Sequence, residues 1–190
     1  MSAVTIAPVT EADRTGLLRR VRAAHRLFEL GVADLTKDQV DHFERKGVLP
    51  IAFSLAHMVI SEDRGMTRLF GVPLLWDAHA GKVRLDGGVP FQGSPMSQAE
   101  KVRIGDVDAW RAYQRDVFTR SEQLIAGASL EKLGDIYPNK PSGTSFLALL
   151  VEDAPARVVD ACEAWVFQHA IRHVGELEHA RALVGLGGLS

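Results

Sequence analysis

Apolar residues recur at intervals of three and four along much of this 190-residue chain, the spacing of a single buried helix face. Several helix boundaries are marked as well. Thr10 is a suitable N-cap for the first segment, and Gly71 and Gly185 follow the second and the last. No segment shows the period-two alternation that is typical of a half-buried strand. Four long amphipathic helices are therefore predicted, over residues 11–30, 50–70, 106–125 and 156–184.

The connections between these segments indicate how the helices are arranged. Residues 71–103 contain so many glycines and prolines that a long helix is excluded, and they form a long crossover between the second and third helices. The apolar run Phe146–Val151 is compatible with a short helix or an extended segment, and its position between helices favours a helical turn. We expect an all-α fold, a four-helix bundle that forms one domain over residues 1–190.

Composition narrows the classes of function. The formal net charge of −2 gives no general attraction for nucleic acid or anionic lipid, and no run of basic residues forms a local patch. The longest apolar run is far shorter than the roughly 20 residues of a membrane span. Cys162 is the single cysteine, which excludes an intramolecular disulfide and suits a reducing compartment. The first ten residues lack the basic and apolar regions of a signal peptide. A cytoplasmic protein is expected.

The last predicted helix carries a candidate metal site. His169 and His173 are four residues apart, so they lie one turn apart on the same helix face, and two such imidazoles can bind one divalent ion. Glu176 follows on that face. The spacing alone is also compatible with two hydrogen-bonded surface histidines. A metal site requires a third ligand from another segment.

The second predicted helix offers that ligand. On a helical wheel His57 lies almost opposite the centre of the apolar stripe, and Arg64 and Arg68 are among its neighbours. This polar face either contacts solvent or lines a polar cleft inside the bundle, and periodicity does not decide between the two. His25 and His79 are interpreted as a packing residue and a surface-loop residue, respectively.

Two segments together resemble a known family. The second helix contains FSLAHMVISEDR and the last contains FQHAIRHVGELEHARALVG, separated by the long crossover and a third helix. The arrangement is similar to that of the DinB/YfiT-like four-helix-bundle metalloproteins. The resemblance implies a three-histidine site of His57, His169 and His173 for a divalent metal, with zinc or nickel expected. Family members of known activity are mostly thiol S-transferases or isomerases that use a low-molecular-weight thiol such as mycothiol or bacillithiol, and many are homodimers.

The expected function follows from this resemblance and from the chemistry of the residues. A metal-bound thiol is deprotonated and attacks small electrophiles at neutral pH, so we expect a thiol S-transferase or isomerase with a small-molecule substrate. Glu176 is interpreted as the orienting acceptor of a histidine ring, as a general base, or as a solvated acid. Arg64 and Arg68 suit carboxylates or hydroxyls of a thiol cosubstrate. Cys162 is expected to be a small buried residue rather than a nucleophile.

Two other functions remain compatible with the same residues. One is a non-catalytic protein that binds a metal or a small ligand, with a role in stress. The other is a hydrolase in which hydroxide on the metal is the nucleophile and Glu176 is the base.

Overall fold

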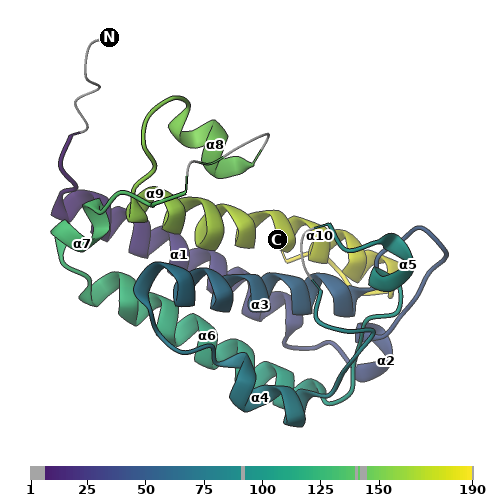
Figure 1. Ribbon diagram of the computed structural model, residues 1–190. Coiled ribbons are helices and arrows are strands. Elements are labelled where there is room, and N and C mark those ends of the chain that lie inside the picture. The colour runs from purple at the N-terminus through teal and green to yellow at the C-terminus, as the bar shows by residue number, and fades with distance from the viewer. Residues whose placement is uncertain (1–6, 91–92, 140, 142–144, 190) are drawn as a thin grey trace.

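The computed structural model describes residues 7–90, 93–139, 141 and 145–189, and in these ranges the fold is an all-α bundle (Figure 1). Two long helices, α1 and α3, each pack against α6 and against α10, so they occupy diagonal corners of the bundle. The predicted four-helix bundle is confirmed. Its long elements are α1 (Glu11–Val32), α3 (Ile51–Phe70), α6 (Val107–Gly127) and the composite last helix of α9 (Val158–Cys162), η1 (Glu163–Gln168) and α10 (His169–Leu183).

Local signals account for the helix boundaries. The Thr10 side chain accepts a hydrogen bond from the backbone of Asp13, whose carboxylate accepts one from the backbone of Thr10, which is a complete capping box at the start of α1. Gly71 ends α3 in the left-handed conformation, with φ of 69°, which glycine adopts at little cost. The Asp106 side chain caps α6 at Ala109 N. These boundaries are those that the sequence predicted.

The last helix differs from the prediction of one uninterrupted α-helix. Residues Glu163–Gln168 form a π-helix, η1, between α9 and α10. A π turn holds more residues than an α turn and therefore rotates the faces of the two flanking helices relative to each other. Cys162, which an unbroken helix would place on the face of His169 and His173, is instead fully buried in the apolar core.

The crossover contains more structure than the glycine and proline content suggested. It forms two helices, α4 (Trp76–Val83) and α5 (Met96–Ala99). Strand β1 (Leu85–Asp86), which follows α4, pairs antiparallel with β2 (Arg103–Ile104), which follows α5, so that Leu85 lies opposite Ile104. The prediction of His79 as a surface-loop residue was wrong, because α4 packs against α6. The His79 side chain is 14% exposed, and its Nε2 lies 3.1 Å from a carboxylate oxygen of Asp116.

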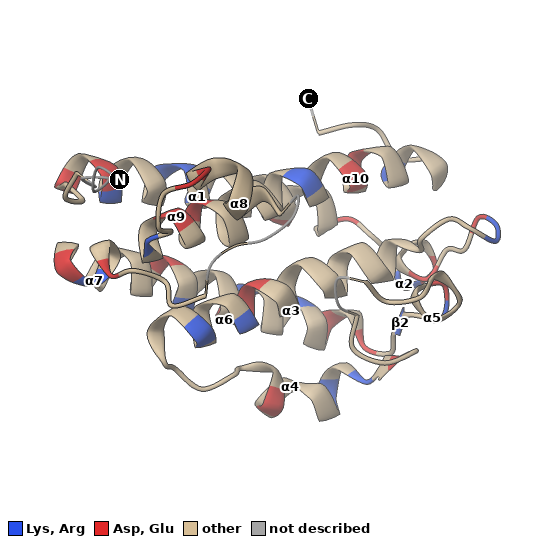
Figure 2. Ribbon diagram, turned by 45° about the horizontal axis from the view of Figure 1, so that its top comes forward, with Lys and Arg blue, Asp and Glu red and all other residues tan. Residues whose placement is uncertain are grey.

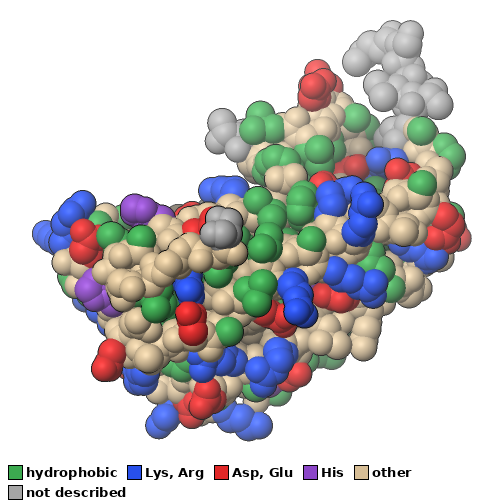
Figure 3. Space-filling view, turned by 180° about the vertical axis from the view of Figure 1, so that it is seen from behind, with side chains coloured by type: hydrophobic (Ala, Val, Ile, Leu, Met, Phe, Trp, Pro, Cys, Tyr) green, Lys and Arg blue, Asp and Glu red, His purple; other side chains and the backbone are tan. Residues whose placement is uncertain are grey.

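Three short helices complete the described chain: α2 (Lys37–Val40), α7 (Leu130–Gly134) and α8 (Phe146–Val151). The run at Phe146 is thus helical, as its position between helices indicated. Only Leu147 of this helix is buried. From behind, α8 stands above the body of the bundle with hydrophobic side chains on its surface (Figure 3).

The core of the bundle contains a buried ionic cluster. The ring of His25 (α1) is 2% exposed and stacks on Phe118, with ring centres 3.9 Å apart. Its Nδ1 lies 3.0 Å from Glu122 and its Nε2 lies 3.1 Å from Glu62, which is fully buried in α3. His25 is therefore a packed and hydrogen-bonded residue, as expected, and it ties α1 to both α3 and α6.

A second buried carboxylate, Asp63, anchors the start of the crossover. It accepts hydrogen bonds from the backbone N–H groups of Leu75 and Trp76, at 3.2 and 2.8 Å, and from the Tyr113 hydroxyl at 2.8 Å. Arg120 pairs with the same carboxylate. A buried charge is tolerated only when it is paired and hydrogen-bonded, and Asp63 meets both conditions. The contacts fasten α3 to α4 and α6.

Charge is spread over the surface of the helices. Positive and negative residues are interspersed along the bundle in the view of Figure 2, rather than separated onto opposite faces. None of the described helices combines the length and the apolar character that a membrane crossing requires.

The ionic cluster predicts a pH-dependent stability. Burial by itself lowers the pKa of His25, but the charge of Glu62 and the hydrogen bond to Glu122 outweigh it and raise the pKa to about 9. Because this value lies above the unfolded value of 6.5, the stabilisation is fully present below pH 6.5 and is lost as the pH rises through about 9. We expect His25→Gln to lower the unfolding free energy by about 3 kcal/mol at pH 6, and by less at high pH.

Urea unfolding of both proteins across this pH range measures the difference. His179→Gln is the matched control, because His179 is an exposed histidine. A destabilisation that stays constant from pH 6 to above pH 9 would contradict a charged His25.

Candidate metal centre

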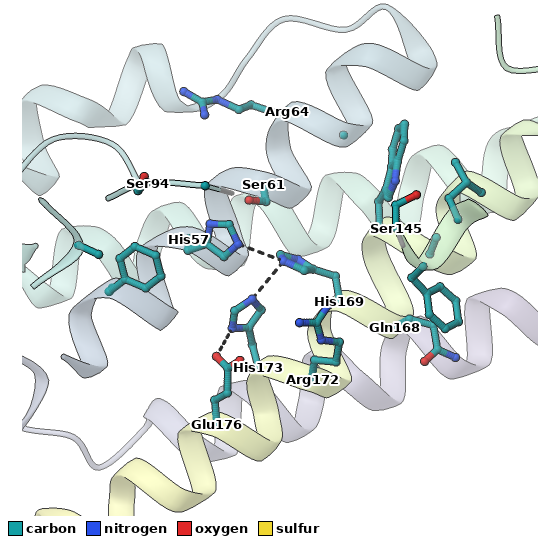
Figure 4. Close-up of a pocket in the computed structure, with 18 of the residues that line it drawn as sticks. His57, Ser61, Arg64, Ser94, Ser145, Gln168, His169, Arg172, His173 and Glu176 are labelled. Atoms are coloured by element: carbon teal, nitrogen blue, oxygen red, sulfur yellow. Dashed lines mark hydrogen bonds and ion pairs between the residues drawn. The ribbon is translucent and has the colours of Figure 1, made fainter. Parts of the chain in front are cut away.

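Three histidine rings from two helices meet at one point. The Nε2 atom of His169 lies 3.3 Å from Nε2 of His57 and 3.0 Å from Nε2 of His173. One ligand atom from each ring lies within 4.8 Å of the other two. Figure 4 shows His57 reaching from α3 toward the pair on α10. The convergence that the sequence required for a metal site is present.

The donor set fits a divalent ion. Nitrogen ligands at 2.0–2.1 Å from a tetrahedral ion are separated from one another by roughly 3.3 Å, and the two nitrogen separations of 3.3 and 3.0 Å are close to this value. Imidazole nitrogens suit zinc and several other first-row ions. Three protein ligands also leave a position for a further ligand, as in catalytic rather than structural zinc sites.

The packing of α3 against the last helix brings the rings together. Ser54 of α3 donates a hydrogen bond of 3.4 Å to Glu176 of α10, and a side chain at Gly65 would contact the Trp165 ring of η1 at 3.7 Å. Residue numbers therefore rise along α3 as they fall along the last helix, and the two run antiparallel. His57, between Ser54 and Gly65, consequently faces the region between Glu176 and Trp165.

Burial keeps two of the rings neutral. Loss of solvent is the largest cause that lowers the pKa of His57, to about 4, with the neighbouring His173 adding to it. Burial likewise lowers the pKa of His169 to about 3, with further contributions from His173 and His57. A metal binds only the neutral ring, so at neutral pH neither side chain has to lose a proton before it binds an ion.

Glu176 lies directly beside the third ring. Its Oε2 lies 2.7 Å from Nδ1 of His173, which favours a proton on Nδ1 and leaves the lone pair of Nε2 directed at the other histidines. The interaction with His173 lowers the pKa of Glu176, so the carboxylate is charged at neutral pH. The side chain is 47% exposed and reaches the solvent side of the site.

The three histidines lie in the wall of a cavity of about 550 Å³. Arg64 and Arg68 also line it, so the polar face of α3 borders this cavity, and both arginines are exposed. The guanidinium of Arg68 lies over the Trp165 ring, 5.7 Å from its centre. All six residues that the sequence singled out as candidates therefore line one cavity: His57, Arg64, Arg68, His169, His173 and Glu176.

Several residues of this wall were not predicted from the sequence. Arg172 was missed, although it lies three residues after His169 and so belongs to the same helix face. Gln168 precedes His169 in the π turn and was missed as well. The lining from the crossover and from α8, which includes Met96, Ala99, Phe146 and Leu147, is brought there by tertiary packing and has no signal in helical spacing.

Cys162 does not take part in the site. It is absent from the cavity wall, and burial raises the pKa of its thiol to about 12. A thiol that stays protonated is a poor nucleophile. This agrees with its interpretation as a small buried residue.

Comparison with known proteins supports the same picture. The family model of the DinB superfamily matches residues 18–177. A crystal structure of a conserved protein from Enterococcus faecalis is similar to this fold, with a TM-score of 0.69 and 15% sequence identity, over 90% of this chain and 96% of that one. At this identity the likeness concerns the fold alone. No curated protein matches the sequence.

The geometry predicts the metal stoichiometry. Purified protein loaded with zinc or nickel should hold about one ion per chain after dialysis, because the described residues form one cluster of three histidines that can hold an ion. His57→Ala, His169→Ala and His173→Ala should each lose most of it, measured by elemental analysis. His179→Ala, an exposed position on the same helix, is the control. If all three site variants keep as much metal as the parent, these rings are not the ligands.

Proposed function

Because this chain belongs to the DinB superfamily and holds three histidine nitrogens around one point, we propose that it is a divalent-metal-dependent thiol S-transferase or isomerase. Its substrates are a low-molecular-weight thiol and a small electrophile. The observation that carries the proposal is the set of three converging imidazoles in the wall of a 550 Å³ cavity, which is within the usual size of a small-molecule site.

The histidines hold the ion and leave room for a ligand. A divalent ion at this position supplies Lewis acidity, and a thiol that coordinates it is deprotonated and nucleophilic at neutral pH. His57, His169 and His173 are the ligands in this proposal. Because these rings are neutral, an ion held there would keep most of its positive charge and would favour an anionic ligand.

Glu176 has two roles in the proposed reaction. Its Oε2 holds the Nδ1 proton of His173 and so fixes the ring in the tautomer that binds metal. The contacts with His173 and Ser54 both use Oε2. The other oxygen, Oε1, is the proposed acceptor for the proton of the incoming thiol. The sulfur then attacks the electrophilic carbon and the leaving group departs.

Arg64 and Arg68 are proposed to bind the thiol cosubstrate. Both line the cavity on the α3 side, where their guanidinium groups can donate hydrogen bonds to carboxylates or hydroxyls. The guanidinium of Arg68 also lies over the ring of Trp165, so the two side chains together form part of the cavity wall. We further propose zinc or nickel as the ion, a reducing cytoplasm as the compartment, and a homodimer as the assembly.

The proposal predicts a reaction that requires both metal and thiol. With monochlorobimane as the electrophile and a panel of small thiols, product should form faster than in the uncatalysed reaction only with metal-loaded protein. His169→Ala should reduce this rate about a hundredfold or more, because the several kcal/mol supplied by the ion are lost. Cleavage of ester probes without thiol would indicate a hydrolase. No turnover of any probe by metal-loaded protein would indicate a non-catalytic binding protein.

A second prediction isolates Glu176. Glu176→Gln keeps the size of the side chain but removes the carboxylate, so metal affinity or activity should fall by about 10- to 100-fold, the usual effect of removing a group that orients a ligand. Competition with a metal chelator measures the affinity and bimane fluorescence measures the activity. Glu178→Gln, two residues further along α10, is the control. Unchanged affinity and unchanged activity together would make Glu176 a solvated acid without a role.

A further inference from the structure

The cavity has different surroundings on the two sides of the histidines. Because α3 and the last helix are antiparallel, Phe53 and Leu49 lie beyond His57 toward one end of the cavity. Ser61, Arg64 and Arg68 lie toward the other end, which faces Trp165 and Gln168. The arginines of α3 therefore lie toward the Trp165 end of the cavity, and the charged side chain near Phe53 is the acid Glu176.

The cavity wall has an excess of positive charge, although the chain as a whole carries a net charge of −2. Three arginines line the cavity: Arg64, Arg68 and Arg172. Glu176 is the one acid among the described lining residues, and its carboxylate is engaged with His173. A divalent ion bound by three neutral rings would add two further positive charges, and Glu176 alone does not balance the total.

Arg64 and Arg172 are not fixed by the rest of the described protein, although the charge of Arg172 acts on that of Glu176. Within the described part of the chain neither makes a hydrogen bond or an ion pair, whereas Arg68 lies on Trp165. They come from opposite walls, Arg64 from α3 and Arg172 from α10 (Figure 4). Arg172 lies between two of the metal-binding histidines in sequence, and its charge acts on the rings of His57 and His169.

A second cation beside a metal ion is unfavourable unless an anion lies close to both. Glu176 is the one anion that the described cavity wall supplies, and it already contacts His173, so a further anion is left for the ligand to supply. A guanidinium binds a carboxylate with two parallel hydrogen bonds, which is the strongest arrangement available to these side chains.

We propose that the cosubstrate is an acidic thiol, a small molecule whose sulfur lies at the three histidines and whose carboxylate is bound by Arg172 and Arg64. This inference rests on the proposed function, because it takes the thiol as given and specifies its charge. The acid group fixes the direction of the molecule: the carboxylate lies toward the arginines, and the end next to Phe53 receives the electrophile. Neutral and cationic thiols are disfavoured.

Helix geometry sets the length of such a molecule. Arg64 is seven residues after His57, which is about 10 Å along the α3 axis at 1.5 Å per residue. A carboxylate close to the sulfur reaches Arg172, and one several bonds further away reaches Arg64. Probes of two lengths therefore test both arginines.

The test compares acids with alcohols of the same length on metal-loaded protein. The probes are 3-mercaptopropionate and 6-mercaptohexanoate against 3-mercaptopropanol and 6-mercaptohexanol, with dissociation constants from calorimetry and metal content measured again afterwards. At one or both lengths the acid should bind about tenfold tighter than the alcohol, which corresponds to about 1.4 kcal/mol. Raising the salt concentration should reduce this ratio.

Variants connect the preference to the arginines. In the double variant Arg64→Gln, Arg172→Gln the acid-to-alcohol ratio should fall to about one, because the acids lose more affinity than the alcohols. The side chains of Arg64 and Arg172 are both exposed, so the double variant should fold. Arg115→Gln is the matched control, because Arg115 is an exposed arginine on α6 that does not line the cavity. It should leave the ratio unchanged.

The outcomes separate this inference from the proposed function. If alcohols and acids bind equally in the parent, or if the double variant keeps the preference, the inference is overturned while thiol binding stands. If no thiol binds but hexanoate without sulfur does, and the double variant loses it, the acid site stands and the thiol chemistry fails. If neither thiols nor hexanoate bind, both proposals are overturned.

Discussion

The rotation of α3 about its own axis is the constraint on which the site depends. At about 100° per residue, Glu62 and Asp63 lie on the side of α3 away from His57. Both carboxylates are fully buried, and each needs its partners on neighbouring helices, since an unpaired buried charge costs several kcal/mol. Pairing Glu62 with His25 and Asp63 with Tyr113 and Arg120 therefore fixes the rotation of the helix, and His57 is turned toward the last helix.

The two polar clusters of the bundle use histidine in opposite ways. His25 lies between two carboxylates, whose negative charge outweighs the cost of burial, so the buried ring is protonated. His57 and His169 are also removed from water but face other imidazoles and the positive charge of Arg172, so they stay neutral. The difference is electrostatic rather than steric. As a result, His25 forms a structural ion pair, whereas His57 and His169 keep a free lone pair, which is the form of the ring that can bind a metal.

The cavity exists because the last helix and the crossover are irregular. The π-helix Glu163–Gln168 carries Trp165 and Gln168 into the wall and leaves Cys162 in the core. Segments of the crossover and α8 close the space beside the histidines. The cavity of about 550 Å³ therefore lies between α3, the last helix, the crossover and α8, beside the bundle core rather than within it.

The sequence by itself determined the elements and the ligand types. Hydrophobic periodicity, the Thr10 and Asp106 caps and Gly71 defined the long helices, because these signals act over a few neighbouring residues. The pair His169 and His173 was visible for the same reason. Only the tertiary structure decided that His57 meets that pair, that Arg172 belongs to the cavity wall, and that the last helix contains a π turn. These features depend on how whole helices rotate and pack, through contacts such as those of Glu62 and Asp63, and residue spacing within one segment carries no information about the angle at which that segment faces another.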